Sequence, residues 1–545
     1  MQEIREQLKS AIKALYGLDF DPDLSPSPEN IDADYSSNAP LKLAKALHRP
    51  PIEIATELEK KLNSVAISNP GFLNFTLSND SLVSEINSLS TNFETEISSK
   101  KFESKTIICE FSDPNPFKVL HVGHLYTSIM GDAISRLFEY AGAKVIRANF
   151  GGDVGLHVAK TMYILQQKDT SNLKIEDIAN CYIEGTAAYD DNETAKQEIT
   201  KLNKEIYQIN TENIHNTPLS DLYWRARKLS YEYFEDFYAK IGVKFDKYYP
   251  ESTVASLGLK TVKEQLEKGV YEYSDGAVIF NGEKFGLHTR VFINKEGVPT
   301  YETKDVGLIF TKWQDYHFDQ SVVITGSEQL DYMKVVLKSV EQYAPDLVER
   351  TTHLTHGLVK LPGGVKMSSR KGNFLKAVDV LDLINDALKE EHDSSDPVVS
   401  LAATKYAFLK YKMGGNIIFD PKESVKMTGN SGPYLLYSSV RAKKILSSPH
   451  NKTPIKDYIY NIYEKSLAKK LLEYHSVLDE AVSDFAPHKL ANYLYELSQS
   501  FSRFYEHCPV IGSSEESERR KLVDIYLNVM THGLGLLGIT IPEEM

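Results

Sequence analysis

One stretch constrains the fold of this 545-residue chain more than any other. An apolar run, Thr106 to Phe111, predicts a buried strand, and the turn sequence Pro114-Asn115-Pro116 follows it. Apolar residues then recur at helical spacing from Leu125 until the pattern stops at Gly142. The stretch therefore predicts a strand that crosses over into a helix, as in an open parallel α/β sheet.

Two histidines, His121 and His124, lie where this helix should begin. They are three residues apart, so they share one side of the first helical turn. The backbone amides of a helix start favour a phosphate, and two imidazoles would add further donors. Gly123 would let a flat base or a ribose approach the backbone. The residues alone therefore predict a nucleotide-binding site.

Length and cysteine usage set the broad class of protein. A chain of 545 residues is too long for one core and should form about two to four domains. No apolar run approaches the roughly 20 residues of a membrane span, so no membrane association is expected. Three cysteines lie far apart, which fits neither a disulfide framework nor a zinc site. A reducing, cytoplasmic location is expected.

The net charge of -13 bears on possible nucleic-acid partners. Proteins that bind nucleic acids are often basic, because Lys and Arg displace counterions from phosphates. An acidic chain would need local basic patches to bind RNA. The candidates are Arg441 with Lys443 and Lys444, Arg519 with Arg520 and Lys521, and the segment Lys366 to Lys371. Each is equally compatible with an ordinary solvated face.

The patterns change along the chain and predict three domains. Residues 1–98 indicate a small α+β domain, with helices at Ile4–Tyr16, Leu41–Leu47 and Ile52–Leu62 before an alternating strand, Phe72–Leu77. Residues 99–373 indicate the nucleotide-binding domain, with a helical and β insertion around 165–295. Residues 374–545 carry helical periodicity throughout. Its predicted helices are Val378–Leu388, Ser400–Tyr411, Pro433–Leu446, Tyr458–Tyr474, Pro487–Tyr505 and Lys521–Leu537.

Polar residues follow several predicted strands of the nucleotide domain. Gly151-Gly152-Asp153 comes after the strand Lys144–Phe150 and suits either a ligand-facing loop or a tight turn. A second strand, Ser321–Gly326, runs into a polar loop that includes Glu328. If a helix begins near Tyr301, Asp305 lies one turn further on the same face.

The segment Leu361 to Asn373 is the second unusual stretch. Lys366, Arg370 and Lys371 surround the hydroxyls of Ser368 and Ser369, and glycines lie at both ends. Such donors could clamp a polyphosphate. A basic surface loop explains the same residues, so the segment alone leaves both readings open.

The two motifs together resemble the class I aminoacyl-tRNA synthetases, whose HIGH and KMSKS signatures they match as His121-Val-Gly-His124 and Lys366-Met-Ser-Ser-Arg370. The sequence around the two motifs is similar to that of the arginyl-tRNA synthetases over nearly the whole chain. The similar stretches are Asn69–Phe75, Glu110–Lys118, Lys366–Asn373, Gly432–Tyr434, Phe504–His507 and the closing residues to Met545.

This resemblance implies a fold and a reaction. The fold would be α/β, a Rossmann-like parallel-sheet catalytic domain with an N-terminal α+β domain that contacts tRNA and a C-terminal all-α helical bundle that binds the anticodon. L-arginine would attack the α-phosphate of ATP, giving arginyl-adenylate and pyrophosphate, and would then pass to the 3′ end of tRNA(Arg). Mg²⁺ would accompany ATP, bound tRNA would be needed for the first step, and a monomer is the family expectation.

The resemblance also assigns residues. ATP and the transition state would be held by His121, Gly123, His124, Lys366, Met367, Ser368 and Arg370, with Lys366 neutralising the departing pyrophosphate. The arginine pocket would contain Glu110, Asn115, Tyr301, Asp305, Glu328 and Asp153. Asp305 would pair bidentately with the guanidinium, a geometry that lysine cannot supply. No protein metal site is expected.

Two departures from the family pattern stand out. Ser369 replaces the second lysine of KMSKS, and Lys118, just before the first motif, would substitute for it; Arg370 and Lys371 are alternatives. In the helical domain, Tyr434-Leu-Leu-Tyr437-Ser-Ser-Val-Arg441 replaces the usual Tyr-x-Gln-Tyr-Ala-His-Ala-Arg. The tRNA-facing surface should therefore differ in detail.

Three alternatives fit the sequence less well. A cysteine-specific synthetase should carry a zinc site, which three scattered cysteines do not offer. A small cytidylyltransferase would need neither the helical bundle nor the second motif. A catalytically silent paralogue that only binds tRNA should have lost His121, His124 or Lys366, and all three are present.

Overall fold

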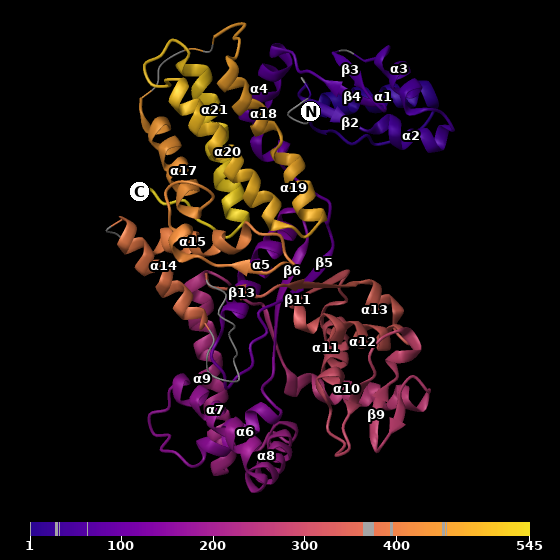
Figure 1. Ribbon diagram of the computed structural model, residues 1–545, viewed down its shortest axis with the longest axis vertical. Helices are drawn as coiled ribbons and strands as arrows, with labels where there is room; N and C mark the ends of the chain where they lie inside the picture. The colour runs from indigo at the N-terminus through magenta and orange to yellow at the C-terminus, as the bar shows by residue number, and fades with distance from the viewer. Residues whose placement is uncertain are drawn as a thin grey trace.

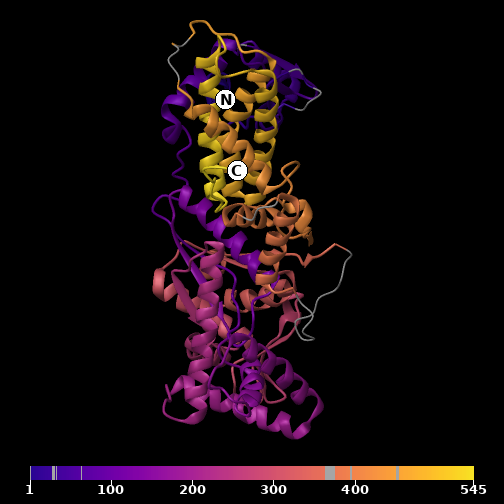
Figure 2. The same ribbon diagram turned by 90° about the vertical axis from the view of Figure 1, so that its left-hand side faces the viewer.

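The computed structural model describes residues 2–27, 31, 33–62, 64–362, 375–392, 396–449, 453 and 455–545. The molecule is elongated, with a helical bundle at one end and the N-terminal domain beside it (Figure 1). A parallel sheet lies in the middle, and two groups of inserted elements form the other end, as the turned view also shows (Figure 2). Within the described ranges, no helix has the length and apolar character needed to cross a membrane.

The central sheet has five parallel strands in the order β12-β11-β5-β6-β7. They are β5 (Thr106–Glu110), β6 (Lys144–Gly151), β7 (Lys247–Pro250), β11 (Gln320–Gly326) and β12 (Thr351–His356). The strands predicted at 106, 144 and 321 are confirmed, and so is the Rossmann-like α/β class. The edge strand β7 was not predicted and lies inside the segment expected to be an insertion. Its four residues, Lys-Tyr-Tyr-Pro, contain no apolar run that would reveal a strand.

The helix α5 (Val122–Tyr140) connects the sheet to the bundle. It packs against β5, β6 and β11 on one side and against five helices of the C-terminal region on the other. Fourteen of its nineteen residues are buried, because both sides of the helix are covered. One contact reaches the end of the chain: Lys405 Nζ donates to the carbonyl of Gly538 at 2.7 Å, beside Asp132 of α5. The predicted strand-to-helix crossover is therefore the centre of the molecule.

Two groups of elements are inserted between the sheet strands. The first is helical and comprises α6 (Leu156–Leu165), α7 (Ile175–Asp191), α8 (Glu193–Thr211) and α9 (Pro218–Ile241). Phe234 and Phe237 of α9 are buried. The second group joins an antiparallel sheet, β8 (Glu272–Ser274), β9 (Ala277–Phe280) and β10 (Arg290–Ile293), to α10 (Glu251–Glu267), α11 (Tyr301–Tyr316), α12 (Leu330–Glu341) and α13 (Pro345–Glu349).

The N-terminal domain has the predicted α+β character. Its helices are α1 (Gln2–Tyr16), α2 (Ala39–Leu47) and α3 (Pro51–Glu59). They cover an antiparallel sheet in the order β1-β2-β4-β3, formed by Ser25–Pro26, Tyr35–Ser37, Phe72–Phe75 and Val65–Ser68. The helix α4 (Asn79–Glu96), which was not predicted, runs from this domain onto the bundle. Asp34 and Lys469 form an ion pair between the two domains.

The C-terminal region is helical, as predicted. Its helices are α14 (Ala377–His392), α15 (Pro397–Leu409), α16 (Pro421–Ser424), α17 (Gly432–Ser447), α18 (Ile462–Leu472), α19 (Tyr474–Ser483), α20 (Pro487–His507) and α21 (Glu516–Leu536). The prediction of one helix over Tyr458–Tyr474 is wrong. Asn461 caps α18 by accepting from the amide of Glu464, so the helix starts late, and α19 starts directly after its end. Apolar periodicity continues across such a break and cannot reveal it.

The position of α11 depends on two glycines. A Cβ atom on Gly307 would overlap the carbonyl oxygen of Val254 in α10, and one on Gly258 would overlap the carbonyl oxygen of Thr303 in α11. The two helix backbones therefore touch at a distance that only glycine permits. This contact sets the place of α11, which carries both Tyr301 and Asp305.

Replacing Gly307 by alanine should destabilise the protein by about 1–3 kcal/mol, because the added methyl group forces the helices apart. The melting temperature measured by calorimetry should fall. The matched control is Gly535→Ala in α21, where a Cβ would meet open space. An unchanged melting temperature for the Gly307 variant would contradict the tight crossing.

Candidate functional site

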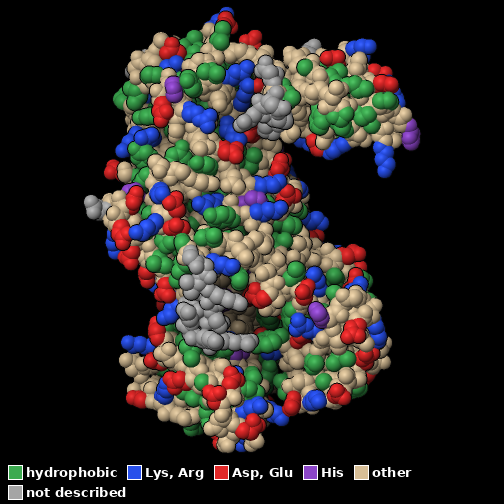
Figure 3. Space-filling model, in the orientation of Figure 1, with side chains coloured by type: hydrophobic (Ala, Val, Ile, Leu, Met, Phe, Trp, Pro, Cys, Tyr) green, Lys and Arg blue, Asp and Glu red, His purple; other side chains and the backbone are tan. Residues whose placement is uncertain are grey.

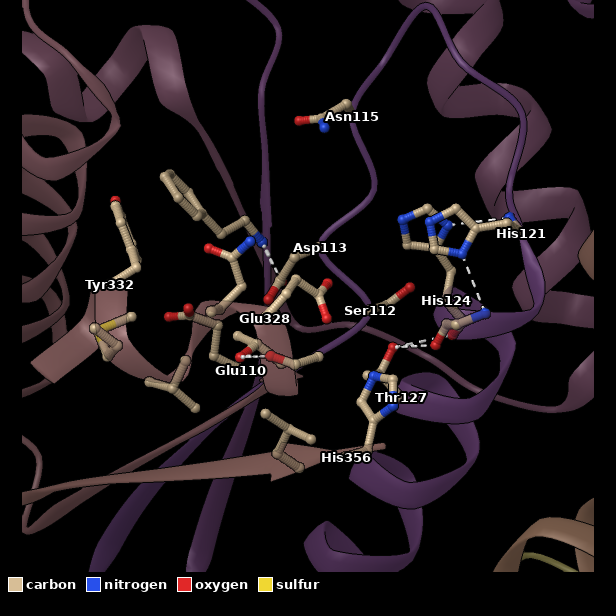
Figure 4. A pocket seen from close by; sticks show the side chains of 18 of the residues that line it. Glu110, Ser112, Asp113, Asn115, His121, His124, Thr127, Glu328, Tyr332 and His356 are labelled. Atoms are coloured by element: carbon tan, nitrogen blue, oxygen red, sulfur yellow. Dashed lines mark hydrogen bonds between the residues drawn. The ribbon is translucent and has the colours of Figure 1, made fainter. Parts of the chain in front are cut away.

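A cavity of about 820 Å³ lies at the carboxyl ends of β5, β6 and β11. Its walls come from the loop after β5, the start of α5, the start of α11 and the loop after β11. Ligands of open parallel sheets bind at this edge. Figure 4 shows the histidines His121 and His124 on one side of the cavity, and Glu110, Asp113, Glu328 and Tyr332 on the other.

The two histidines cap the helix that they begin. The ring of His121 accepts the amide of Gly123 through Nδ1 at 3.1 Å, and His124 Nδ1 accepts the amide of His121 at 3.1 Å. The rings stack with centroids 3.8 Å apart. Side-chain acceptors at this position satisfy amides that a helix start leaves without partners. The two histidines therefore stabilise the start of α5, in addition to their predicted role in phosphate binding.

Both imidazoles are neutral at physiological pH. Burial lowers the pKa of His121 to about 4, and Lys118 and His356 add to this effect. Burial also holds the pKa of His124 well below its ordinary value. Because each Nδ1 accepts a backbone N–H, the proton of each neutral ring is on Nε2. Two Nε2–H donors thus lie on the side of the cavity where the nucleotide is expected to bind.

Carboxylates dominate the opposite side. Glu110 is buried at the end of β5 and accepts from Lys312 Nζ at 2.7 Å. Asp113 accepts the amide of Phe150 at 2.8 Å, and burial beside Glu110 raises its pKa well above the ordinary value. A second buried pair joins Glu251 to Lys304. Two of the acidic groups on this side are thus already balanced by buried lysines.

Asp305 differs from Glu110 and Glu251 in having no ion-pair partner among the described residues. Its Oδ2 accepts the hydroxyl of Tyr332. Burial, with smaller contributions from the carboxylates Glu110, Glu251 and Glu302, raises the pKa of Asp305 to about 8, although the hydrogen bond from Tyr332 opposes this shift. A bound cation would reverse this shift. The predicted placement of Tyr301 and Asp305 one turn apart is confirmed, since α11 begins at Tyr301 and both line the cavity.

The loop between β5 and α5 has an unusual backbone. Ser112, Asp113 and Phe117 have φ values of 71°, 48° and 69°. Non-glycine residues in this region are strained and cluster at functional sites. In the same loop, Asn115 lines the cavity and accepts the amide of Gly152 through Oδ1 at 3.0 Å. This hydrogen bond and the one from Phe150 to Asp113 hold the loop against the end of β6.

Most of the predicted site residues that the structure describes meet in this one cavity. Its lining includes Glu110, Asn115, His121, Gly123, His124, Tyr301, Asp305 and Glu328. Lys118 lies outside the lining, with Nζ 4.4 Å from the ring centroid of Tyr182, although its charge still acts on both histidines. The predicted ATP ligands Lys366, Met367, Ser368 and Arg370 lie outside the described residues.

Asp153 is not brought into the cavity. It is fully buried, and its carboxylate accepts the amide and hydroxyl of Ser252 at 2.9 and 2.7 Å. Arg227 Nε also donates to it at 2.9 Å. The carboxylate therefore joins α9 to the start of α10. Its predicted contact with arginine has no support in this geometry.

The cavity also contains residues that sequence reasoning missed. They are Asp113, Glu251, Arg290, Glu302, Tyr332 and His356. Glu251 directly follows β7, so an acid at a strand end was the available signal, but the strand itself was not recognised. Arg290 belongs to the small antiparallel sheet, which nothing in the sequence connects to the nucleotide domain.

The segment that follows the second motif forms backbone hydrogen bonds with the residues around the first motif. The amide of Val122 donates to the carbonyl of Leu375 at 2.9 Å, and the amide of Ala377 donates to Leu120 at 3.0 Å. His121 and Lys376 thus form an antiparallel bridge. The chain is held beside the histidines at this point.

A Mg²⁺ ion would depend on the nucleotide for its ligands. Among the described residues, no three His, Cys, Asp or Glu side chains are grouped to hold a metal. Mg²⁺ commonly keeps substrate phosphates and water as ligands.

Comparison with known proteins identifies the family. Residues 86–418 match the model for the catalytic domain of tRNA synthetases class I (R). The chain belongs to the arginyl-tRNA synthetase family. Residues 2–77 match the arginyl-tRNA synthetase N-terminal domain, and residues 435–545 match the DALR anticodon-binding domain. The predicted family, ligase class and domain types are confirmed, while the predicted domain boundaries stay predictions.

Similar proteins cover the whole chain. Arginine–tRNA ligase of Synechococcus elongatus is 29% identical, over 100% of this chain and 99% of its own. That of Treponema denticola is 29% identical, over 95% and 94%. The Thermus thermophilus arginyl-tRNA synthetase structure matches with a TM-score of 0.80 at 23% identity, covering 100% of both chains. The Plasmodium falciparum structure matches with 0.79 at 20%, covering 100% of this chain and 99% of that one.

Proposed function

We propose that this protein ligates L-arginine to tRNA(Arg), activating arginine with ATP and releasing AMP after transfer. The observation that supports this most is the division of one cavity into two sides. Neutral imidazole donors line one side, and acidic side chains line the other, among them the buried Asp305, which has no ion-pair partner among the described residues. A triphosphate and a guanidinium are the groups that these two sides suit.

The chemistry requires no protein nucleophile, because the carboxylate of arginine attacks the α-phosphate. The protein must hold the two reactants in line and stabilise charge that develops on phosphate oxygens. The Nε2–H groups of His121 and His124 are fixed donors for this charge, since their Nδ1 atoms are already bonded to backbone amides. Lys118, Lys366 and Arg370 would add positive charge around the pyrophosphate.

Asp305 is the group that selects arginine in this proposal. Tyr332 donates to Oδ2, and because each carboxylate oxygen can accept two hydrogen bonds, both oxygens can still accept from the guanidinium. Tyr301, which is 53% exposed, provides a flat wall one turn away. Glu110, Asn115 and Glu328 are proposed to orient the α-amino and carboxylate groups. Asp153 is left out of the binding set.

The tRNA is proposed to contact the helical bundle and the N-terminal domain. Lys and Arg side chains gather on the bundle near the N-terminal domain (Figure 3). On the bundle, Arg441 stacks on Tyr437 and Tyr505, with 4.3 and 5.2 Å from the guanidinium carbon to the ring centroids. Such aromatic and guanidinium surfaces stack unpaired bases. The candidate patch at Arg519, Arg520 and Lys521 does not support RNA binding, because these side chains form ion pairs with glutamates of the bundle. Arg441 and its aromatic neighbours are therefore the proposed RNA-facing surface. We also propose that the protein acts as a monomer in the cytoplasm.

The deciding experiment is ATP–pyrophosphate exchange with each amino acid, with and without tRNA. Arginine should support exchange when tRNA is present, and lysine should not, because its ammonium cannot pair bidentately with Asp305. Exchange supported by another amino acid but not by arginine would refute the proposed specificity. Charging of tRNA without any exchange activity would refute the adenylate route.

Arginine binding should release a proton. Below pH 8 the unliganded Asp305 is mainly protonated, and the guanidinium requires its ionised form. The affinity for arginine should therefore rise about tenfold per pH unit from pH 6 and level off above pH 8. Calorimetric titration in two buffers measures both affinity and proton release. ATP affinity serves as the control and should not follow this profile; a flat arginine profile would contradict the assignment.

Replacing His124 by asparagine should lower the rate of adenylate formation about a hundredfold, because one fixed donor to the phosphates is lost. The side-chain oxygen of asparagine can still accept the amide of His121, so the melting temperature should change little. Single-turnover kinetics with saturating substrates measure the rate. A normal rate would remove His124 from the proposed mechanism.

A further inference from the structure

A lysine is buried beneath the arginine side of the cavity. Lys312 of α11 is 1% exposed and lies outside the cavity lining. Its Nζ donates to Glu110 Oε2 on β5 at 2.7 Å and to Ser321 Oγ on β11 at 3.0 Å. One ammonium group thus joins a helix to two neighbouring strands. Lys312 is not among the residues proposed to contact ATP or arginine.

The pair with Lys312 decides which oxygen of Glu110 is available. Glu110 lines the cavity but is only 3% exposed, so its orientation is fixed by its surroundings. Lys312 occupies Oε2, and within the described ranges Oε1 has no hydrogen-bond partner. A buried carboxylate needs a compensating cation. The lysine therefore fixes the orientation of Glu110 through Oε2 and leaves Oε1 to accept from a ligand.

Two lysines of α11 form buried ion pairs, and an aspartate of the same helix forms none with the described residues. Lys304 neutralises Glu251, Lys312 neutralises Glu110, and Asp305 between them has no cation among the described residues. Of these three carboxylates, Asp305 is therefore the one whose cation a ligand must supply. Glu110, whose charge is already balanced, is suited to a directional hydrogen bond rather than to binding a second full charge at the same place.

We propose that Lys312 is a positioning residue for arginine, which holds Glu110 so that Oε1 accepts a hydrogen bond from the α-ammonium group of the substrate. The proposal rests on the proposed function. It separates the two recognition events: Asp305 binds the guanidinium directly, and Lys312 acts at the other end of the substrate through Glu110. Lys312 itself touches neither arginine nor ATP.

The test compares two ligands that differ at one group. L-arginine carries the α-ammonium, and 5-guanidinopentanoic acid keeps the guanidinium and the carboxylate but lacks it. Lys312→Met should weaken arginine binding about tenfold in calorimetry, the usual size for a lost charge-assisted hydrogen bond. Binding of 5-guanidinopentanoic acid should stay unchanged. Equal losses for both ligands would indicate general distortion of the pocket and would overturn the proposal.

A double-mutant cycle tests whether Lys312 acts through Glu110. In a Glu110→Gln background, adding Lys312→Met should cost no further arginine affinity, because the group being positioned is already altered. A further tenfold loss would overturn the proposal. If the Lys312→Met single variant fails to fold, the double variant can still be measured, because removing both charges leaves no unpaired buried ion.

Two controls separate this proposal from other causes. Lys405→Met removes an equally buried lysine far from the cavity, one that donates to Gly538. It should lower the melting temperature without changing the ratio of the two ligand affinities; a changed ratio would show that any buried-lysine loss has this effect and would overturn the proposal. If the wild-type protein bound neither ligand, the proposed function itself would fail, which is a different outcome from equal losses in the variant.

Discussion

The structure depends on the way the buried helix α5 begins. A helix start leaves backbone amides without partners, and here the rings of His121 and His124 accept two of them. The same bonds fix which nitrogen of each ring carries the proton, and burial keeps both rings uncharged. Since α5 packs on the sheet and on the bundle, local helix stability, domain assembly and phosphate recognition share the same two side chains. A change that disturbed the cap would affect all three.

The opposite side of the cavity is organised by charge balance along α11. Burying several carboxylates together is costly, and the structure offsets this cost with lysines beneath the surface of the cavity. The close glycine crossing with α10 fixes how far α11 stands from the sheet. Because α11 carries both Asp305 and Tyr301, its position decides how far these two side chains lie from Glu110 at the end of β5. Specificity therefore depends on backbone packing some way from the substrate.

The sequence predicted the parts of this fold that carry long, regular patterns. The apolar run of β5 and the 3.6-residue pattern of α5 located the crossover, and the spacing of Tyr301 and Asp305 placed both on one helix face. The short strand β7 and the break before α19 have no such pattern and were missed. Asp153 illustrates a different limit, since its partner Arg227 lies in another helix and no local pattern shows that pairing. Lys312 is similar, because a lysine in an amphipathic helix normally indicates a solvated position. The roles of the segment 363–374 came from family resemblance.

The pairing of residues 120–122 with residues 375–377 has a consequence for protein engineering. The two signature motifs are distant in sequence, yet the chain that leaves the second one forms backbone hydrogen bonds with the first. A boundary drawn at residue 373 or 374 would cut between the second motif and its attachment. Chimeras that exchange the second motif between relatives should therefore be joined after Ala377, so that the graft brings its own attachment to the histidines.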